Sequence, residues 1–191
     1  DWSSDVCSSD LREDNKKVLV HYAACDLAIS KNEGADYSVF IVAGMDDSGK
    51  LFCKHVIRDR MDAHEIVETI LMITKIYKPV MFGIEQNMIH KAIGPYLNEA
   101  MMKSGTFANL QILKPSGDKI TRARSIQARM RSGACRFDKD AEWYLDFEDE
   151  LMKFPRARHD DQVDTWAYMG LMIDKMWAGD RKSTRLNSSH G

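Results

Sequence analysis

The sequence lacks several features that define large classes of proteins. No apolar run approaches the roughly 20 residues of a membrane span, and no signal peptide is recognisable. Outside the first 11 residues only Cys25, Cys53 and Cys135 remain, an odd number without CxxC spacing. This pattern argues against a disulfide framework or a zinc site and for a reducing compartment. No GxxxxGK(S/T) loop occurs either, so we expect no ATP hydrolysis by this chain. Because no membrane span is recognisable, we also expect no membrane partner.

Composition is that of an ordinary globular domain, with 44% hydrophobic and 29% charged residues. The net charge of -2 says little about partners, but one segment is strongly basic. A solvated helix face is one interpretation of that segment, and a contact with a phosphate backbone is the other. Between residues 114 and 131 the only acid is Asp118, and the basic residues are Lys114, Lys119, Arg122, Arg124, Arg129 and Arg131.

Both ends of the chain look foreign to the rest. Residues 1–11 and 180–191 resemble translations of one common sequencing-library adapter, read on opposite strands. We therefore expect the native domain to lie within residues 12–179, with its true ends lost, and we give no functional weight to residues in either tail.

Three carboxylates, Asp160, Asp161 and Asp164, lie within five residues, just before the apolar run 166–173. Acids at the start of a helix can cap free N–H groups and complement the helix dipole. Clustered oxygens are also what a hard divalent cation prefers. This segment alone leaves capping and metal binding about equally supported.

Two further acids each end an apolar, strand-like run. Asp26 follows the run 18–25, and Glu85 follows the run 79–84. A carboxylate at the end of a buried strand is costly unless a cation meets it, although a strand-end surface residue is the commoner case. Together with the acidic helix start, these two residues suggest a site for two metal ions roughly 3.5–4 Å apart.

The order of expected elements is mixed α/β. We expect strands at 18–26, 37–45 and 50–59 as an antiparallel meander, and the first and fourth strands side by side. A capping box at 62–65 opens a helix that ends before Pro79. The remaining expected elements are strands at 80–85, 109–114 and 134–137, and helices at 89–104, 120–132, 141–154 and 160–177, the last with an apolar stripe of Val163, Trp166, Gly170, Ile173 and Trp177.

This order and its motifs resemble the ribonuclease H-like fold, a mixed central sheet flanked by helices. More narrowly they resemble the C-terminal nuclease domain of tailed-phage terminase large subunits. The matching pieces cover nearly all of the native part. They are Asp26-Leu27-Ala28-Ile29-Ser30-Lys31, Ala35-Asp36-Tyr37-Ser38, Ile84-Glu85-Gln86-Asn87, Asp118-Lys119 with Arg122, and residues 154–164 with His159-Asp160-Asp161-Gln162-Val163-Asp164.

The resemblance implies a role for each matching residue. Asp26 would bridge two metal ions, Glu85 would bind one of them, and Asp161 the other, with Asp160 as co-ligand or support. Asp164 would orient a ligand or be an exposed helix acid. Asp36 would shape the hairpin near the site or start a strand, and His159 would position a phosphate or be structural. The basic residues implied in contacts with DNA are Lys119, Arg122, Arg124 and Arg129.

The activity implied is a two-metal endonuclease, with Mg²⁺ or Mn²⁺, that cuts double-stranded concatemeric viral DNA during packaging in the host cytoplasm. An ATPase domain upstream, the portal and the small terminase subunit would be its partners. Two alternatives remain open at this point. One is another nuclease of the same fold, such as a junction resolvase or transposase core, and the other is a non-catalytic module that grips DNA.

Overall fold

The computed structural model describes residues 18–29, 36–86, 93–114, 117–156 and 159–187. Along the chain the strands and helices follow in the order expected from the sequence. The elements are β1 (Val20–Asp26), β2 (Ser38–Met45), β3 (Leu51–Asp59), α1 (Ala63–Tyr77), β4 (Met81–Glu85), α3 (Gly94–Ser104), β5 (Leu110–Leu113), α4 (Lys119–Arg131), β6 (Cys135–Phe137), α5 (Tyr144–Lys153) and α6 (Asp161–Asn187).

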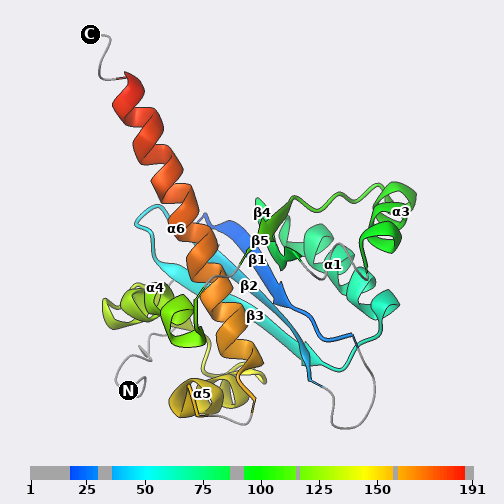
Figure 1. Ribbon diagram of the computed structural model, residues 1–191, viewed down its shortest axis with the longest axis horizontal. Coiled ribbons are helices and arrows are strands. Elements are labelled where there is room, and N and C mark those ends of the chain that lie inside the picture. The colour runs from blue at the N-terminus through cyan, green and yellow to red at the C-terminus, as the bar shows by residue number, and fades with distance from the viewer. Residues whose placement is uncertain (1–17, 30–35, 87–92, 115–116, 157–158, 188–191) are drawn as a thin grey trace.

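The strands form one six-stranded sheet in the order β5-β4-β1-β2-β3-β6. β1, β2 and β3 are antiparallel neighbours, while β4 runs parallel to β1, β5 to β4 and β6 to β3. The predicted meander and the predicted pairing of the first and fourth strands are therefore confirmed. The mixed sheet flanked by helices is the ribonuclease H-like arrangement (Figure 1).

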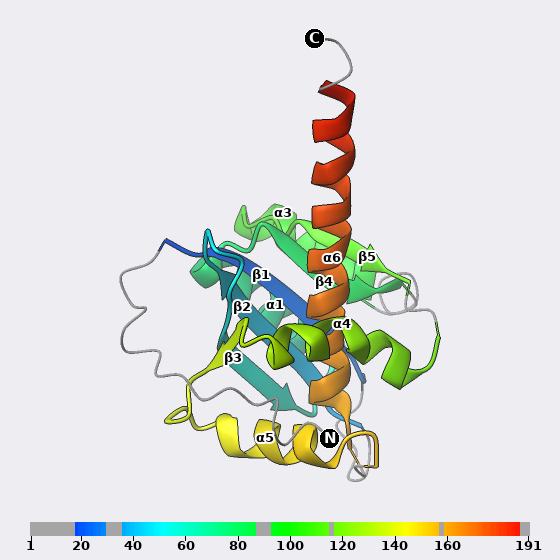
Figure 2. The same cartoon turned by 90° about the vertical axis from the view of Figure 1, so that its left-hand side faces the viewer.

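Helices cover both faces of the sheet, and each face has its own hydrophobic core. One core joins the sheet to α4, α5 and α6, and it contains Trp166 and Phe147. The other joins the sheet to α1 and α3, and it contains Ile66 and Leu97. Figure 2 shows α6 crossing the sheet, with α4 packed across it and α5 at its N-terminal end.

The final helix differs from its prediction in two ways. An apolar stripe on one side was expected, but residues 162–170 are all buried because the sheet, α4 and α5 surround the first turns. The helix also continues to Asn187, past the predicted end at Trp177, and Figure 1 shows this part projecting beyond the sheet. The backbone thus remains helical into the segment that resembles adapter sequence.

Two glycines allow α6 to approach its neighbours closely. A Cβ at Gly83 of β4 would lie 2.6 Å from the Sδ atom of Met172. A Cβ at Gly170 would lie 3.0 Å from Cβ and 3.1 Å from the backbone nitrogen of Ile126 in α4. An added Cβ at Gly170 would press on the backbone of Ile126 and push α6 away from α4, whereas at Gly83 it would displace the end of the Met172 side chain.

Several boundaries shift by a few residues. The capping box is present: Asp62 accepts from the backbone N–H of Glu65, and Glu65 accepts from that of Asp62. The third helix begins at Gly94, and the first part of its predicted range, residues 87–92, lies outside the described residues. α5 begins at Tyr144 rather than at Ala141. The described helices include none that is long and apolar enough to cross a membrane.

Candidate metal centre

The acids predicted from strand ends lie at one edge of the sheet. β1 and β4 are parallel, and their register pairs Cys25 with Ile84, so Asp26 and Glu85 follow at neighbouring strand ends. α6 begins at the same edge, and Asp161 and Asp164 lie in its first turn. Both are close enough to Asp26 for their charges to raise its pKa. Further along α6, the hydroxyl of Tyr168 donates to Oε2 of Glu85 at 3.2 Å.

These carboxylates repel one another strongly. The pKa of Asp26 is raised from 3.8 to about 7, first by burial and then by the charges of Asp164, Glu85 and Asp161. The pKa of Asp161 is also raised, by burial and by Asp36, while Arg58 opposes this shift. Without a cation the cluster therefore holds a proton near neutral pH, which is the behaviour of like charges that share one site.

Helix capping does not account for the three aspartates. The backbone N–H groups of Gln162 and Val163, in the first turn of α6, both donate to Oε1 of Glu150 on α5, at 2.6 and 3.0 Å. The side-chain amide of Gln162 donates to the other oxygen of Glu150 at 2.9 Å. A residue from another helix thus satisfies these donors, and among the described residues no aspartate side chain accepts from them. Capping of these two N–H groups is therefore done by Glu150, although Asp161 and Asp164 lie in the first turn, where acids complement the helix dipole.

Two basic residues of α4 neutralise part of the cluster. The ammonium group of Lys119 lies 2.6 Å from Oδ1 of Asp160 and 3.0 Å from Oδ2 of Asp164. The guanidinium of Arg122 lies 3.1 Å from Oδ1 of Asp164. Asp164 is thus not an exposed helix acid: its side chain is only 7% exposed and both its oxygens are paired. That interpretation is corrected, whereas a role in orienting its neighbours fits this geometry.

The chemistry of this donor set fits a divalent cation. Its oxygens are hard ligands of the kind that Mg²⁺ and Mn²⁺ prefer. The Oδ2 atom of Asp161 is buried and has no hydrogen-bond partner, which is costly unless a cation or a water meets it. In the described ranges, however, no three Asp, Glu, His or Cys side chains are already close enough to enclose an ion. The carboxylates would have to close around a cation, with Lys119 giving way.

The remaining predicted residues lie around this cluster. Asp36 precedes β2 and is close enough to act on the pKa of Asp161. The ring of His159 packs edge-on against Tyr37, with centroids 5.6 Å apart. On α4, Arg124 is exposed, and Arg129 lies 3.7 Å from Asp174.

Sequence reasoning missed Glu150, Tyr168 and Arg58. Glu150 acts through a contact between two helices, and no spacing along the chain indicates it. Tyr168 follows Asp164 by four residues, so helical spacing could have placed it on the acidic side of α6. Arg58 is in a strand whose face could not be assigned from alternation alone, because a bulge opposite Val42 and Ala43 shifts the register.

Comparisons with known proteins agree with this fold. Residues 23–172 match the family model described as the terminase RNaseH-like domain. The large terminase nuclease of thermophilic phage G20c with bound magnesium aligns with a TM-score of 0.58 and 17% identity, covering 80% of each chain. The same nuclease has also been solved with cobalt and with zinc. A search of curated proteins found no match.

Two other solved structures share the fold. The human cytomegalovirus terminase nuclease domain has a TM-score of 0.55 and 12% identity, covering 82% of this chain and 83% of that chain. A large terminase from a thermophilic bacteriophage in complex with ADP has a TM-score of 0.53 and 11% identity, covering 78% of this chain but only 38% of that chain. With its family model matched over residues 23–172, the chain belongs to the family of terminase ribonuclease H-like nuclease domains.

Proposed function

We propose that this chain is a metal-dependent endonuclease that hydrolyses phosphodiester bonds of double-stranded DNA. The observation that carries the proposal is the convergence of Asp26, Glu85 and Asp161 from two strand ends and a helix start. Burial first, and then the charges of Asp164, Glu85 and Asp161, raise the pKa of Asp26 to about 7. A fold gains nothing from such repulsion, but a cation that binds there relieves it.

Two divalent cations, Mg²⁺ or Mn²⁺, would be held by Asp26, Glu85 and Asp161, with Asp160 supporting the second. When bound, such ions supply an activated water and stabilise the leaving 3′ oxygen of the DNA strand. The solved G20c nuclease with magnesium, cobalt or zinc supports divalent cations as the class of cofactor. No side-chain nucleophile is needed for this reaction.

The side chains of this chain would then act as ligands and as positioning groups. Asp26 must lose the proton that it holds near neutral pH before both of its oxygens can serve as ligands. Tyr168 donates to one oxygen of Glu85 and so fixes its orientation. Asp164 keeps Arg122 beside the carboxylates, because its Oδ1 atom accepts from that guanidinium.

In the whole protein this activity would cut concatemeric viral DNA during genome packaging in the host cytoplasm. The match to only 38% of a large terminase solved with ADP supports an ATPase domain elsewhere in the full-length protein. The portal and the small terminase subunit would be further partners. The terminase family match favours this role over a junction resolvase or a transposase core.

The test is nicking of supercoiled plasmid DNA with Mg²⁺ or Mn²⁺, and its arrest by a chelator. Asp26→Asn should abolish cleavage while circular dichroism shows an intact fold. The matched control is Asp47→Asn, since Asp47 is exposed in the turn between β2 and β3, at the other end of the sheet. A folded Asp26→Asn protein that cuts at the wild-type rate in Mg²⁺ would overturn the mechanism.

A further inference from the structure

Several basic side chains of helix α4 already lie next to acidic side chains of the protein. Of the four basic residues predicted to contact DNA, Lys119 and Arg122 pair with Asp160 and Asp164, and Arg129 lies near Asp174. Ion pairs of this kind weaken the attraction of these cations for phosphate. If this chain binds DNA, other cations near the carboxylates are needed to hold the strand that is cut.

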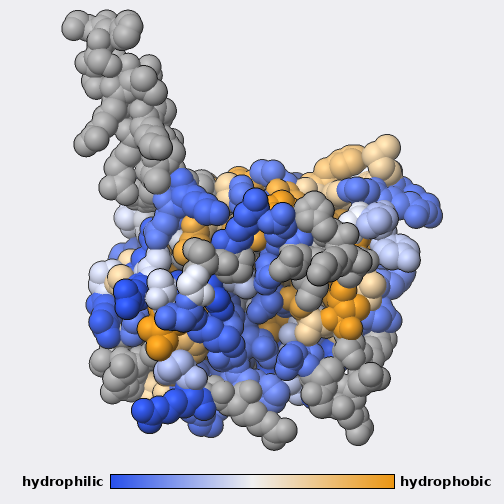
Figure 3. All heavy atoms as spheres, in the orientation of Figure 1, coloured by the Kyte–Doolittle hydropathy of each residue, from blue (hydrophilic) through white to orange (hydrophobic). Residues whose placement is uncertain are grey.

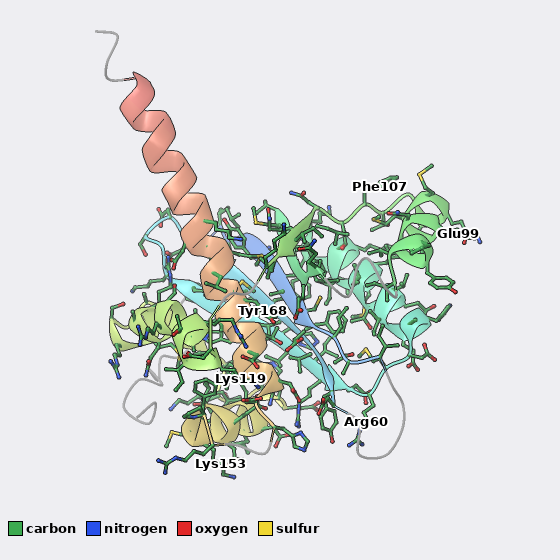
Figure 4. All side chains as sticks on the ribbon, viewed as in Figure 1. Arg60, Glu99, Phe107, Lys119, Lys153 and Tyr168 are labelled. Atoms are coloured by element: carbon green, nitrogen blue, oxygen red, sulfur yellow. The ribbon has the colours of Figure 1, made fainter. Side chains whose placement is uncertain are left out.

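A second cationic group lies on the other side of the start of α6. It consists of Tyr37, Arg58, Arg60 and His159, and we refer to it as the Tyr37 cluster. The guanidinium carbons of Arg58 and Arg60 lie 3.9 and 4.5 Å from the centroid of the Tyr37 ring. His159 packs edge-on against the same ring. Figure 4 shows Lys119 and Arg60 on opposite sides of the N-terminal end of α6.

An irregularity in β3 turns Arg58 toward the carboxylates. Val42 of β2 pairs with His55 and Ala43 pairs with Cys53, so Lys54 is an extra residue in the strand. This bulge places Val56 in the same core as Leu51 and Cys53, and Arg58 follows Val56 on that face. Arg58 therefore faces α5 and α6, where it acts on the pKa values of Glu150 and Asp161.

The cluster brings two guanidinium groups to one aromatic ring, each in contact with its face. The Nε atom of Arg58 is buried and has no hydrogen-bond partner among the described residues. A buried donor without an acceptor is destabilising, and a ligand oxygen would satisfy it. The Nε atom of Arg122 on α4 is in the same situation, but the guanidinium of Arg122 is already paired with Asp164. The planar guanidinium matches the oxygens of a phosphate group, which accepts from two N–H donors at once.

We propose that the Tyr37 cluster binds the phosphodiester backbone of the substrate strand beside the bond that is cut. The inference rests on the proposed function and adds where the strand lies. Arg58 and Arg60 contact phosphate oxygens, Tyr37 holds both guanidinium planes in place, and His159 borders the same site. The strand then passes between the Tyr37 cluster and the carboxylates rather than along the outer side of α4. On the face seen in Figure 3 the described surface is mostly hydrophilic, with several hydrophobic patches.

The experiment measures binding of a short fluorescent DNA duplex by anisotropy, in chelator so that nothing is cut, over a series of salt concentrations. Arg58→Ala combined with Arg60→Ala should raise Kd at least tenfold. It should also flatten the slope of log K against log salt by about 1 to 2, since each phosphate contact contributes about 0.9. Tyr37→Ala should give an intermediate loss, and Tyr37→Phe should bind like the wild type, because the ring rather than the hydroxyl holds the arginines.

Two matched double variants make the result specific. Lys75→Ala with Lys103→Ala removes the same charge from α1 and α3 on the other face of the sheet, and it should leave the salt slope nearly unchanged. Arg124→Ala with Arg129→Ala tests α4. The inference is overturned if the Arg58 and Arg60 variant keeps the wild-type slope while the α4 variant loses it.

Folding and metal binding are controlled separately. Arg60→Ala alone and Arg58→Lys avoid removing the half-buried Arg58 side chain; each should fold and show a smaller flattening of the slope than the double alanine variant. Calorimetry with Mn²⁺ measures metal affinity separately. Arg60→Ala and Tyr37→Phe should keep the wild-type affinity, whereas Arg58→Ala removes a positive charge that acts on Asp161 and should not weaken Mn²⁺ binding. Failure of the wild type to bind metal or cut DNA would refute the proposed function, while the salt slope would still report on the Tyr37 cluster.

Discussion

The ammonium group of Lys119, the first residue of α4, lies 2.6 Å from Oδ1 of Asp160, just before α6 begins. The same group is 3.0 Å from Asp164, so one lysine neutralises two aspartates of the acidic segment. Lys119 therefore stabilises the acidic segment in the absence of metal. With the metal site proposed above, a divalent cation would have to compete with this ammonium group.

Lys119→Ala should accordingly separate these two effects. In chelator we expect a loss of about 1 kcal/mol in the free energy of unfolding, a modest figure because the lysine side chain is 48% exposed. In Mg²⁺ the shift in melting temperature between metal-bound and metal-free protein should be larger than for the wild type. Lys153→Ala is the control, since Lys153 pairs with Asp149 on the surface of α5. An unchanged metal-induced shift would contradict this competition.

The pKa of Asp26 predicts how stability depends on pH without metal. Its ordinary value is 3.8 and its value in the fold is about 7, so between these values the folded state keeps a proton that the unfolded state has lost. The contribution of Asp26 to stability is therefore present below about pH 4 and decreases as pH rises to about 7, by up to about 1.4 kcal/mol per pH unit. Asp26→Asn should remove this dependence, so above pH 7 the variant should be the more stable protein.

Urea unfolding in chelator between pH 4 and pH 8 measures this difference directly. The wild-type and Asp26→Asn curves should lie close together at the acid end and separate as pH rises. Adding Mg²⁺ should reduce the separation, because a bound cation stabilises the ionised carboxylate that Asn cannot provide. Two curves that stay parallel over the whole range would show that Asp26 titrates normally.

Glu150 should matter for cleavage although it lies outside the carboxylate cluster. Glu150→Ala leaves the N–H groups of Gln162 and Val163 without their acceptor, at a cost of roughly 3 kcal/mol. Glu150→Gln retains one oxygen and should cost about 1 kcal/mol. Both should cut DNA more slowly than Asp149→Asn, which changes the exposed neighbour on the same helix. Equal cleavage rates at a temperature where all variants are folded would contradict this role.

The tails that resemble adapter sequence should contribute little to the fold. Deleting residues 1–11 and 180–191 should leave the melting temperature within about 2 °C of the full chain, the scale of a surface change. Differential scanning calorimetry on both proteins measures this. A larger decrease in melting temperature would mean that these residues are part of the folded domain. The test is informative because the backbone is helical up to Asn187.

The parts of the fold that sequence predicted well depend on local patterns. The capping box at Asp62 and Glu65 involves residues three apart. The strands that end at Asp26 and Glu85 were predicted from their apolar composition. Parallel pairing of β1 and β4 followed from the order of elements. These features need no knowledge of distant contacts.

The partners of the acids could not be predicted in the same way. Arg122 and Asp164 are separated by 42 positions, and their contact exists only because α4 packs across α6 at Gly170. From sequence, the basic residues of α4 were predicted to contact DNA. A run of basic residues indicates positive charge, but it does not indicate whether an acid of the protein or a phosphate is the partner. Glu150 likewise acts across a helix–helix contact. Sequence alone could not show that Glu150, rather than an aspartate, accepts from the N–H group of Gln162.

The order of the elements has a consequence for the timing of synthesis. Asp26 and Glu85 belong to strands made early, whereas Asp160, Asp161 and Asp164 come with α6, after β6 has completed the sheet. A chain translated only as far as β6 has a finished sheet but only part of the carboxylate cluster. A polypeptide truncated before α6 therefore lacks Asp160, Asp161 and Asp164, and the carboxylate cluster forms only when the last helix packs on the sheet.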